Sequence, residues 1–213
     1  ERFLITGTDI RLTPTDSLVE RFGLFTIIVL GEVVVGVVEG ISEGERTALA
    51  VATGMIGLMI GFAFWWTYFD FVGDRRPHAD GGRLTHWIFG HLPVTVSIAA
   101  TGAAMVRLVE HAGDDRAPTA TAWLLSGAVA LGLVSLIMII RTLADYVRFP
   151  NVYQPLGWAL ALSALASTHV GALRPPPWLL ALLLVAVLSL VWLFAIGLWV
   201  KTGDPDAQVP ATD

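Results

Sequence analysis

The sequence contains no cysteine and little charge, and these shortages exclude several classes of protein. Without cysteine there are no disulfides, no thiolate metal sites and no cysteine nucleophile. Charged residues make up 15% of the 213 residues and hydrophobic residues 55%, whereas soluble domains have about 25% and about 45–50%. This apolar excess is too large for one soluble core, and no basic stripe indicates binding to nucleic acid.

Recognisable catalytic and cofactor motifs are also missing. The chain has no nucleophile elbow, Walker loop, HExxH zinc motif or Rossmann glycine pattern. His86 and His91 are five residues apart, so on a helix they point in different directions and do not form a metal-binding pair. We therefore predict no catalytic residue, no cofactor and no metal ion.

Six long apolar blocks make up most of the chain. Each has about the length, roughly 20 residues, that a helix needs to cross about 30 Å of hydrocarbon, where a helix satisfies its own backbone polar groups. Short polar connections separate the blocks. The sequence therefore predicts an all-α polytopic transmembrane bundle of six helices, at about residues 18–38, 47–72, 86–108, 120–141, 155–173 and 177–200.

The remaining residues flank this single predicted domain, residues 18–200. Residues 1–17 are predicted to form an N-terminal cytoplasmic segment, and residues 201–213 a disordered C-terminal tail. The chain begins at Glu1 without an initiator methionine, and no short apolar region with a cleavage site follows. We therefore expect an excised or processed piece of a protein, without a signal peptide.

The distribution of Lys and Arg predicts the orientation of the bundle. With six spans both termini lie on one side, which receives nine Lys or Arg residues, while the other side receives four. Because basic loops stay in the cytoplasm, both termini are predicted to be cytoplasmic. The nine are Arg2, Arg11, Arg21, Arg75, Arg76, Arg83, Arg141, Arg148 and Lys201, and the four are Arg46, Arg107, Arg116 and Arg174.

Glu32 is the clearest candidate for a functional residue. It lies about ten residues into the first block, roughly 15 Å from its start at about 1.5 Å per residue, and charges at this depth are costly and mark functional sites. One helical face carries Arg21, Phe25, Ile28, Glu32 and Glu39. We expect this face to point into the bundle, where Glu32 would bind an ion or proton, or would only tie helices together.

Asp70 and His91 are further candidates. Asp70 closes the second block, and an acidic residue is unfavourable at a helix C-terminus, so we expect a cationic partner for it: Arg21, Arg75, Arg141 or His91. His91 precedes Pro93, which frees the backbone carbonyl near position 89. His91 and this carbonyl could coordinate a cation or relay a proton, or His91 could only form a hydrogen bond between helices.

Arg141 shares one predicted helical face with Asp145 and Arg148. It can pair with Asp145 within the fourth helix, or with Asp70 or Glu20 across helices. Arg141 could therefore form a structural salt bridge, or it could contact an anion or a lipid headgroup.

Small residues predict where helices pack closely. Gly54, Gly57 and Gly61 lie on one face of the second block, and Gly36 and Gly40 repeat the spacing on the first. Such faces pack either within a chain or between copies of it. A homo-oligomer that associates through the glycine faces is therefore one of the two alternatives.

Three segments resemble the motifs of a known family. ERFGLFTIIVLGE (residues 20–32), WWTYFD (65–70) and HLP (91–93) are similar, in order and spacing, to motifs of the bacterial low temperature requirement A family. The resemblance covers the first three predicted helices. It implies a multi-pass protein of the bacterial inner (plasma) membrane, of which this chain resembles the C-terminal half. It implies no substrate, because the family is named after a cold-growth phenotype.

Taken together, these features favour a transporter or channel-like protein for a small solute or ion. Glu32 would be the binding or coupling residue, and a polar cluster towards the cytoplasm would comprise Arg21, Asp70, His91 and Arg141. The alternatives are a membrane-embedded enzyme acting on a lipid-soluble substrate through His91 and an acid, and a non-catalytic membrane factor in stress adaptation. The predicted partners are the lipid bilayer and a small molecule or ion of unknown identity.

Overall fold

The computed structural model describes residues 15–78 and 80–202, which form helices and loops without a named strand. Six of the helices are long and apolar enough to cross a membrane, which confirms the predicted all-α bundle of six spans. The helices are α1 Asp16–Glu43, α2 Ala48–Tyr68 continued by the π-helix η1 Phe69–Gly73, α3 Gly81–Glu110, α4 Thr119–Ile140, α5 Ala144–Arg148, α6 Pro150–Leu173 and α7 Pro177–Thr202.

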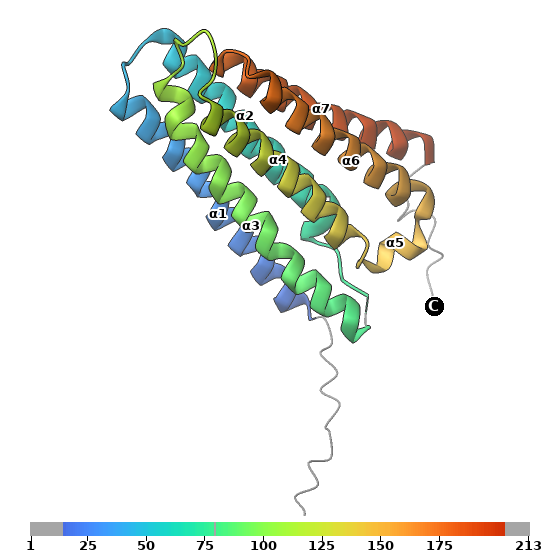
Figure 1. Ribbon diagram of the computed structural model, residues 1–213. Coiled ribbons are helices and arrows are strands. Elements are labelled where there is room, and N and C mark those ends of the chain that lie inside the picture. The colour runs from blue at the N-terminus through green and yellow to red at the C-terminus, as the bar shows by residue number, and fades with distance from the viewer. Residues whose placement is uncertain (1–14, 79, 203–213) are drawn as a thin grey trace, which may run out of the picture.

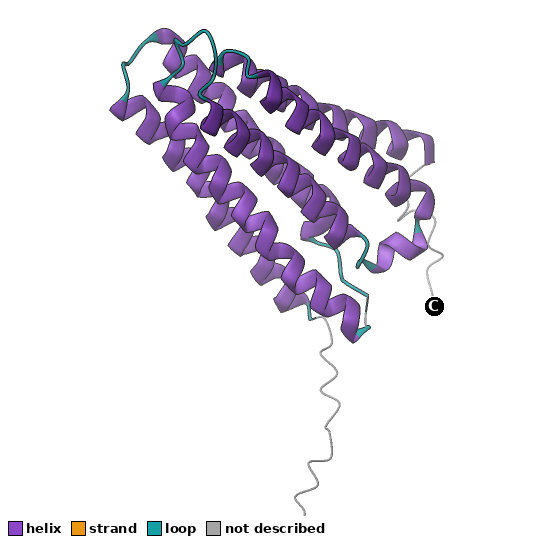
Figure 2. Ribbon diagram, viewed as in Figure 1, coloured by secondary structure: helices purple, strands orange, loops and turns teal. Residues whose placement is uncertain are grey.

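The long helices are arranged in three layers of two (Figure 1). The outer layers are the contacting pairs α1 with α3 and α6 with α7. Between them lie α2, which packs on α1 and α7, and α4, which packs on α3 and α6. The loops gather at the two ends of the bundle (Figure 2). Most of the predicted N-terminal segment and C-terminal tail, residues 1–14 and 203–213, lies outside the described residues; residues 201 and 202 belong to α7.

Polar side chains and prolines set the starts of the helices. The hydroxyl of Thr15 accepts a hydrogen bond from the backbone N–H of Leu18, and the hydroxyl of Thr47 one from Ala50. Such caps satisfy N–H groups that lack a partner within the helix. Pro150 occupies the first turn of α6, where its missing N–H costs nothing. Our prediction that this helix starts at Pro155 was therefore wrong by one to two turns.

Large hydrophobic side chains cover the outside of the bundle. Ile28 on α1 is 71% exposed and Phe89 on α3 is 68% exposed, and every other long helix carries similar residues. In water so many exposed apolar residues would be unfavourable, whereas acyl chains solvate them well. The surface of the bundle therefore matches a lipid environment.

Glycines bring α1 and α3 into direct backbone contact. A Cβ atom on Gly36 would overlap the carbonyl oxygen of Gly102 on α3, and a Cβ atom on Gly102 would overlap the carbonyl oxygen of Glu32 on α1. Gly40 lies one turn beyond, against Val106. This is the close approach that small residues permit between membrane helices.

The glycines of α2 also pack within the chain. Gly54 and Gly57 lie against Val37 of α1, and Gly57 in addition against the sulfur of Met105. The predicted glycine faces of α1 and α2 are therefore buried inside the bundle, and the homo-oligomer stays a prediction.

Candidate functional site

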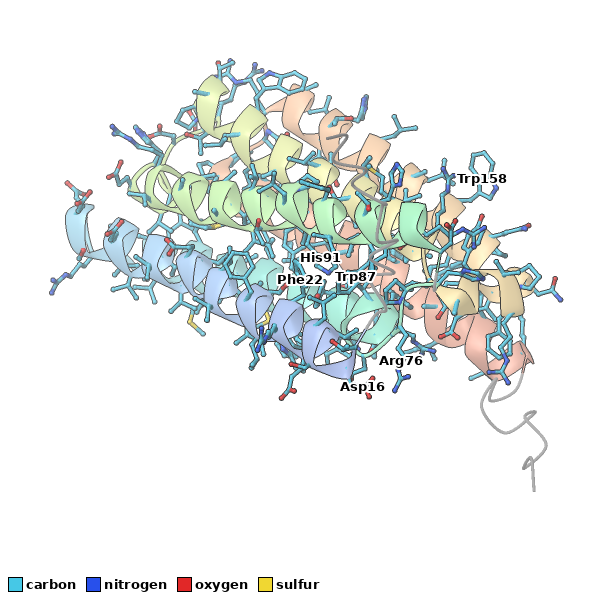
Figure 3. The ribbon with its side chains drawn as sticks, turned by 90° about the horizontal axis from the view of Figure 1, so that it is seen from below. Asp16, Phe22, Arg76, Trp87, His91 and Trp158 are labelled. Atoms are coloured by element: carbon cyan, nitrogen blue, oxygen red, sulfur yellow. The ribbon has the colours of Figure 1, made fainter. Side chains whose placement is uncertain are left out.

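A buried aromatic cluster joins the first three spans. It consists of Phe22 on α1, Tyr68 at the end of α2, and Trp87 and His91 on α3. His91 is 1% exposed, and Tyr68 and Trp87 are equally inaccessible. Figure 3 shows Phe22, Trp87 and His91 close together between the ribbons of α1 and α3. We call these four residues the aromatic cluster.

Both ring nitrogens of His91 have hydrogen-bond partners. Nδ1 lies 2.7 Å from the backbone carbonyl oxygen of Trp87, and Nε2 lies 3.1 Å from the hydroxyl of Tyr68. Because a carbonyl only accepts, Nδ1 donates, and in the neutral ring Nε2 is left to accept from the Tyr68 hydroxyl. The predicted hydrogen bond of His91 between helices is therefore present, and neither nitrogen is free for a cation in this arrangement.

Aromatic rings surround His91 on its remaining sides. The ring of Phe22 lies 4.6 Å from the imidazole and 4.9 Å from the ring of Trp87, centroid to centroid. Trp87 packs edge-on against His91 at 4.4 Å. Such offset and edge-to-face arrangements are favourable for aromatic pairs, so the cluster holds the imidazole in a fixed orientation.

The indole N–H of Trp87 is the exception to this satisfied network. It is buried and has no hydrogen-bond partner among the described residues. An unpaired buried donor lowers the stability of a fold by about 1–3 kcal/mol. Nearby, Pro93 lacks a backbone N–H and so removes one hydrogen bond from α3. The cluster thus tolerates an unsatisfied donor close to His91.

Glu32 lies on the outward face of α1, which corrects our prediction that this face points into the bundle. Arg21, Phe25 and Ile28 are exposed together with Glu32. The buried side of α1 includes Gly23, Gly36 and Gly40 instead, and Gly36 lies only one turn after Glu32. The reason is steric, because only the glycine face lets α1 approach the backbone of α3.

The carboxylate of Glu32 has no hydrogen bond or ion pair with any residue that the structure describes. The same holds for the guanidinium of Arg21. Neither Glu32 nor His91 lines any of four cavities formed by the described residues. These four cavities therefore do not lead to Glu32, and within the described residues no hydrogen bond joins His91 to a carboxylate.

Asp70 accepts a hydrogen bond from a tryptophan, where we had predicted a cationic partner. The indole N–H of Trp192 on α7 donates to Oδ2 of Asp70 at 3.2 Å. Asp70 lies in η1, where the helix widens from α to π and the side chains after Tyr68 turn out of the α-helical register. Asp70 consequently contacts Trp192 on α7 and not Arg21.

Arg141 and Asp145 do not share a helix, so the predicted pair within the fourth helix is wrong. Helix α4 ends at Ile140, and Asp145 belongs to the five-residue helix α5. The carboxylate of Asp145 instead accepts from Arg75 at 2.9 Å. Arg141 is exposed and forms no ion pair within residues 15–78 and 80–202.

No described contact joins any two of the five predicted site residues. What the structure brings together is one residue from each of the three quoted segments: Phe22 from ERFGLF, Tyr68 from WWTYFD and His91 from HLP. Sequence analysis missed Tyr68, Phe22 and Trp87 as partners of His91. Their positions in the sequence could have indicated them: Phe22 and Tyr68 lie inside the quoted segments, and Trp87 lies four residues before His91.

Comparisons with known proteins identify the family of the chain. No curated protein and no solved structure matches the chain. A family model, described as bacterial low temperature requirement A protein (LtrA), matches residues 6–195, a range that contains the aromatic cluster and all six spans apart from the end of α7. The chain is therefore an integral membrane protein that belongs to the bacterial low temperature requirement A (LtrA) family.

Proposed function

We propose that the chain is a transport protein that moves protons or a small cation, with Glu32 as its membrane-embedded binding or coupling residue. The observation that carries this proposal is the depth of Glu32. At about 1.5 Å per residue, Glu32 lies about 24 Å along a helix that is about 42 Å long. This position falls within the hydrocarbon region, on an outward face with no partner for the carboxylate in the described residues.

A carboxylate facing acyl chains at this depth costs about 3 kcal/mol on insertion scales. Water or further protein along the outer face of α1 would remove this cost. Arg21 lies on the same face, about 16 Å nearer the start of α1. The two residues would then line one wall of a polar passage, and its second wall would come from another copy or from protein outside this bundle.

The aromatic cluster argues against the enzyme alternative. A membrane enzyme that uses His91 and an acid needs the imidazole and a carboxylate within hydrogen-bond reach. His91 instead contacts Tyr68, Trp87 and Phe22. In this proposal the cluster is the fixed packing unit that holds α1, α2 and α3 beside the passage.

Flux measurements on the purified protein in liposomes test the proposal. With an imposed pH gradient and a pH-sensitive dye inside the vesicles, the wild-type protein should dissipate the gradient, and Glu32→Gln should slow this at least tenfold. The matched control is Glu43→Gln, since Glu43 is exposed on the same helix but at its end. A wild-type rate in Glu32→Gln, or no flux of protons, sodium or potassium through the wild type, would contradict the proposal.

A further inference from the structure

A cavity of about 260 Å³ lies where α4, α5 and α6 meet. Its polar lining comes from Arg141, Tyr146, Tyr153 and Gln154, and its apolar lining includes Trp158. Gly157 forms part of the wall, and a Cβ atom at this position would meet nothing within 4 Å. The cavity is therefore open space beside a helix and not a packing defect in the core.

Arg141 supplies a positive charge that nothing in the described residues neutralises. It directly follows the last residue of α4. Its nearest acidic neighbour in sequence, Asp145, is bound to Arg75 at 2.9 Å. An arginine at the end of a membrane span lies at the depth of lipid headgroups, and its planar guanidinium matches the geometry of a phosphate.

A second, apolar groove lies between α6 and α7, on the other side of Gln154 and Trp158. Gln154 and Trp158 line both spaces, and the groove of about 940 Å³ then runs along Leu162, Leu190 and Phe194. Trp158 is 73% exposed and projects outward from the bundle, away from His91 (Figure 3). The combined site is thus positively charged at the end of the bundle and apolar towards its middle.

We propose that this combined site binds an anionic phospholipid. The phosphate would accept hydrogen bonds from Arg141 and from the Gln154 amide, and an acyl chain would lie in the groove against Trp158 and Leu162. Basic pockets between membrane helices recognise acidic headgroups in this way, and tryptophan favours the headgroup boundary. The apolar groove selects a lipid over a free phosphate, because a free phosphate would leave the groove unfilled.

Native mass spectrometry of the delipidated protein can test this site, with phosphatidylglycerol as the anionic probe and phosphatidylcholine as the zwitterionic one. The wild type should bind phosphatidylglycerol at least tenfold more tightly. Arg141→Gln should abolish this preference. The matched control is Arg148→Gln, because Arg148 lies at the same end of the bundle, over the ring of Phe149 at 5.2 Å, and lines neither space.

A second variant tests the space without touching the charge. Gly157→Leu fills the cavity from an open position, so it should lower phosphatidylglycerol binding at least tenfold while the melting temperature without lipid stays the same. Equal binding of the two lipids by the wild type would overturn the proposal. So would an equal loss in Arg148→Gln, unchanged binding in Gly157→Leu, or displacement of the lipid by millimolar inorganic phosphate.

Discussion

The hydroxyl of Tyr68 lies 3.1 Å from Nε2 of His91 and links α2 to α3 inside the bundle. Tyr68 is the last residue before η1, and His91 lies two residues before Pro93 in α3. The hydrogen bond therefore fixes the point at which two irregular stretches of helix face each other. Because both side chains are buried, water cannot replace either partner.

Tyr68→Phe should destabilise the protein by about 1 kcal/mol. The substitution keeps the ring but leaves Nε2 of His91 without a donor, and hydrogen bonds between membrane helices are worth about 0.6 kcal/mol on average and up to about 1.7. The measurement is the thermal unfolding midpoint in detergent. Tyr146→Phe serves as the control, because Tyr146 is only half-buried and lies outside the aromatic cluster. An equal shift of the unfolding midpoint in the two variants would contradict a stabilising hydrogen bond between Tyr68 and His91.

Gly36→Ala should destabilise the protein by about 1–3 kcal/mol, the usual cost of forcing extra volume into a packed interface. The new methyl group would overlap the backbone of Gly102, so α1 and α3 would have to separate. Gly31→Ala is the matched control on the same helix, since its methyl group would meet nothing within 4 Å. Unfolding in denaturant or heat should leave Gly31→Ala at or above the wild-type stability, because alanine favours a helix more than glycine. Equal stability of the two variants would contradict the described contact.

Asp70→Asn should be nearly neutral, whereas Asp70→Leu should cost about 1 kcal/mol. Asparagine retains an oxygen that accepts from the indole of Trp192, and leucine does not. If a cation were the partner that matters, both substitutions would weaken the protein alike, because both remove the charge. Melting temperatures of the two variants, with Trp192→Phe as the reciprocal change, separate these cases.

The fold could be predicted from sequence because each span carries its own signal. Continuous apolar blocks and polar breaks placed all six spans, with ends that differ by a few residues. The start of α6 was misplaced because Pro150 and Pro155 both suit a first turn, and the sequence alone does not rank them. Helix α5 was missed because five residues are too few to show a helical period.

The candidate site was harder to predict because helical spacing shows which residues share a face but not where that face points. On α1, Glu32 and Gly36 lie one turn apart, and the close packing of Gly36 on Gly102 leaves the side chain of Glu32 exposed. For His91 the prediction of a cross-helix hydrogen bond was sound, yet its partner depends on how α2 lies against α3. Tyr68 could not be assigned to His91 without that arrangement.

The crossing of α1 and α3 at Gly36 and Gly102 has a mechanical consequence. The two backbones touch there directly, so we expect α1 and α3 to move together. The two helices would consequently form one unit, which carries the exposed Glu32 on α1 and the buried His91 on α3. A shift of α1 at Glu32 would therefore also move α3, and with it the hydrogen bond between His91 and Tyr68.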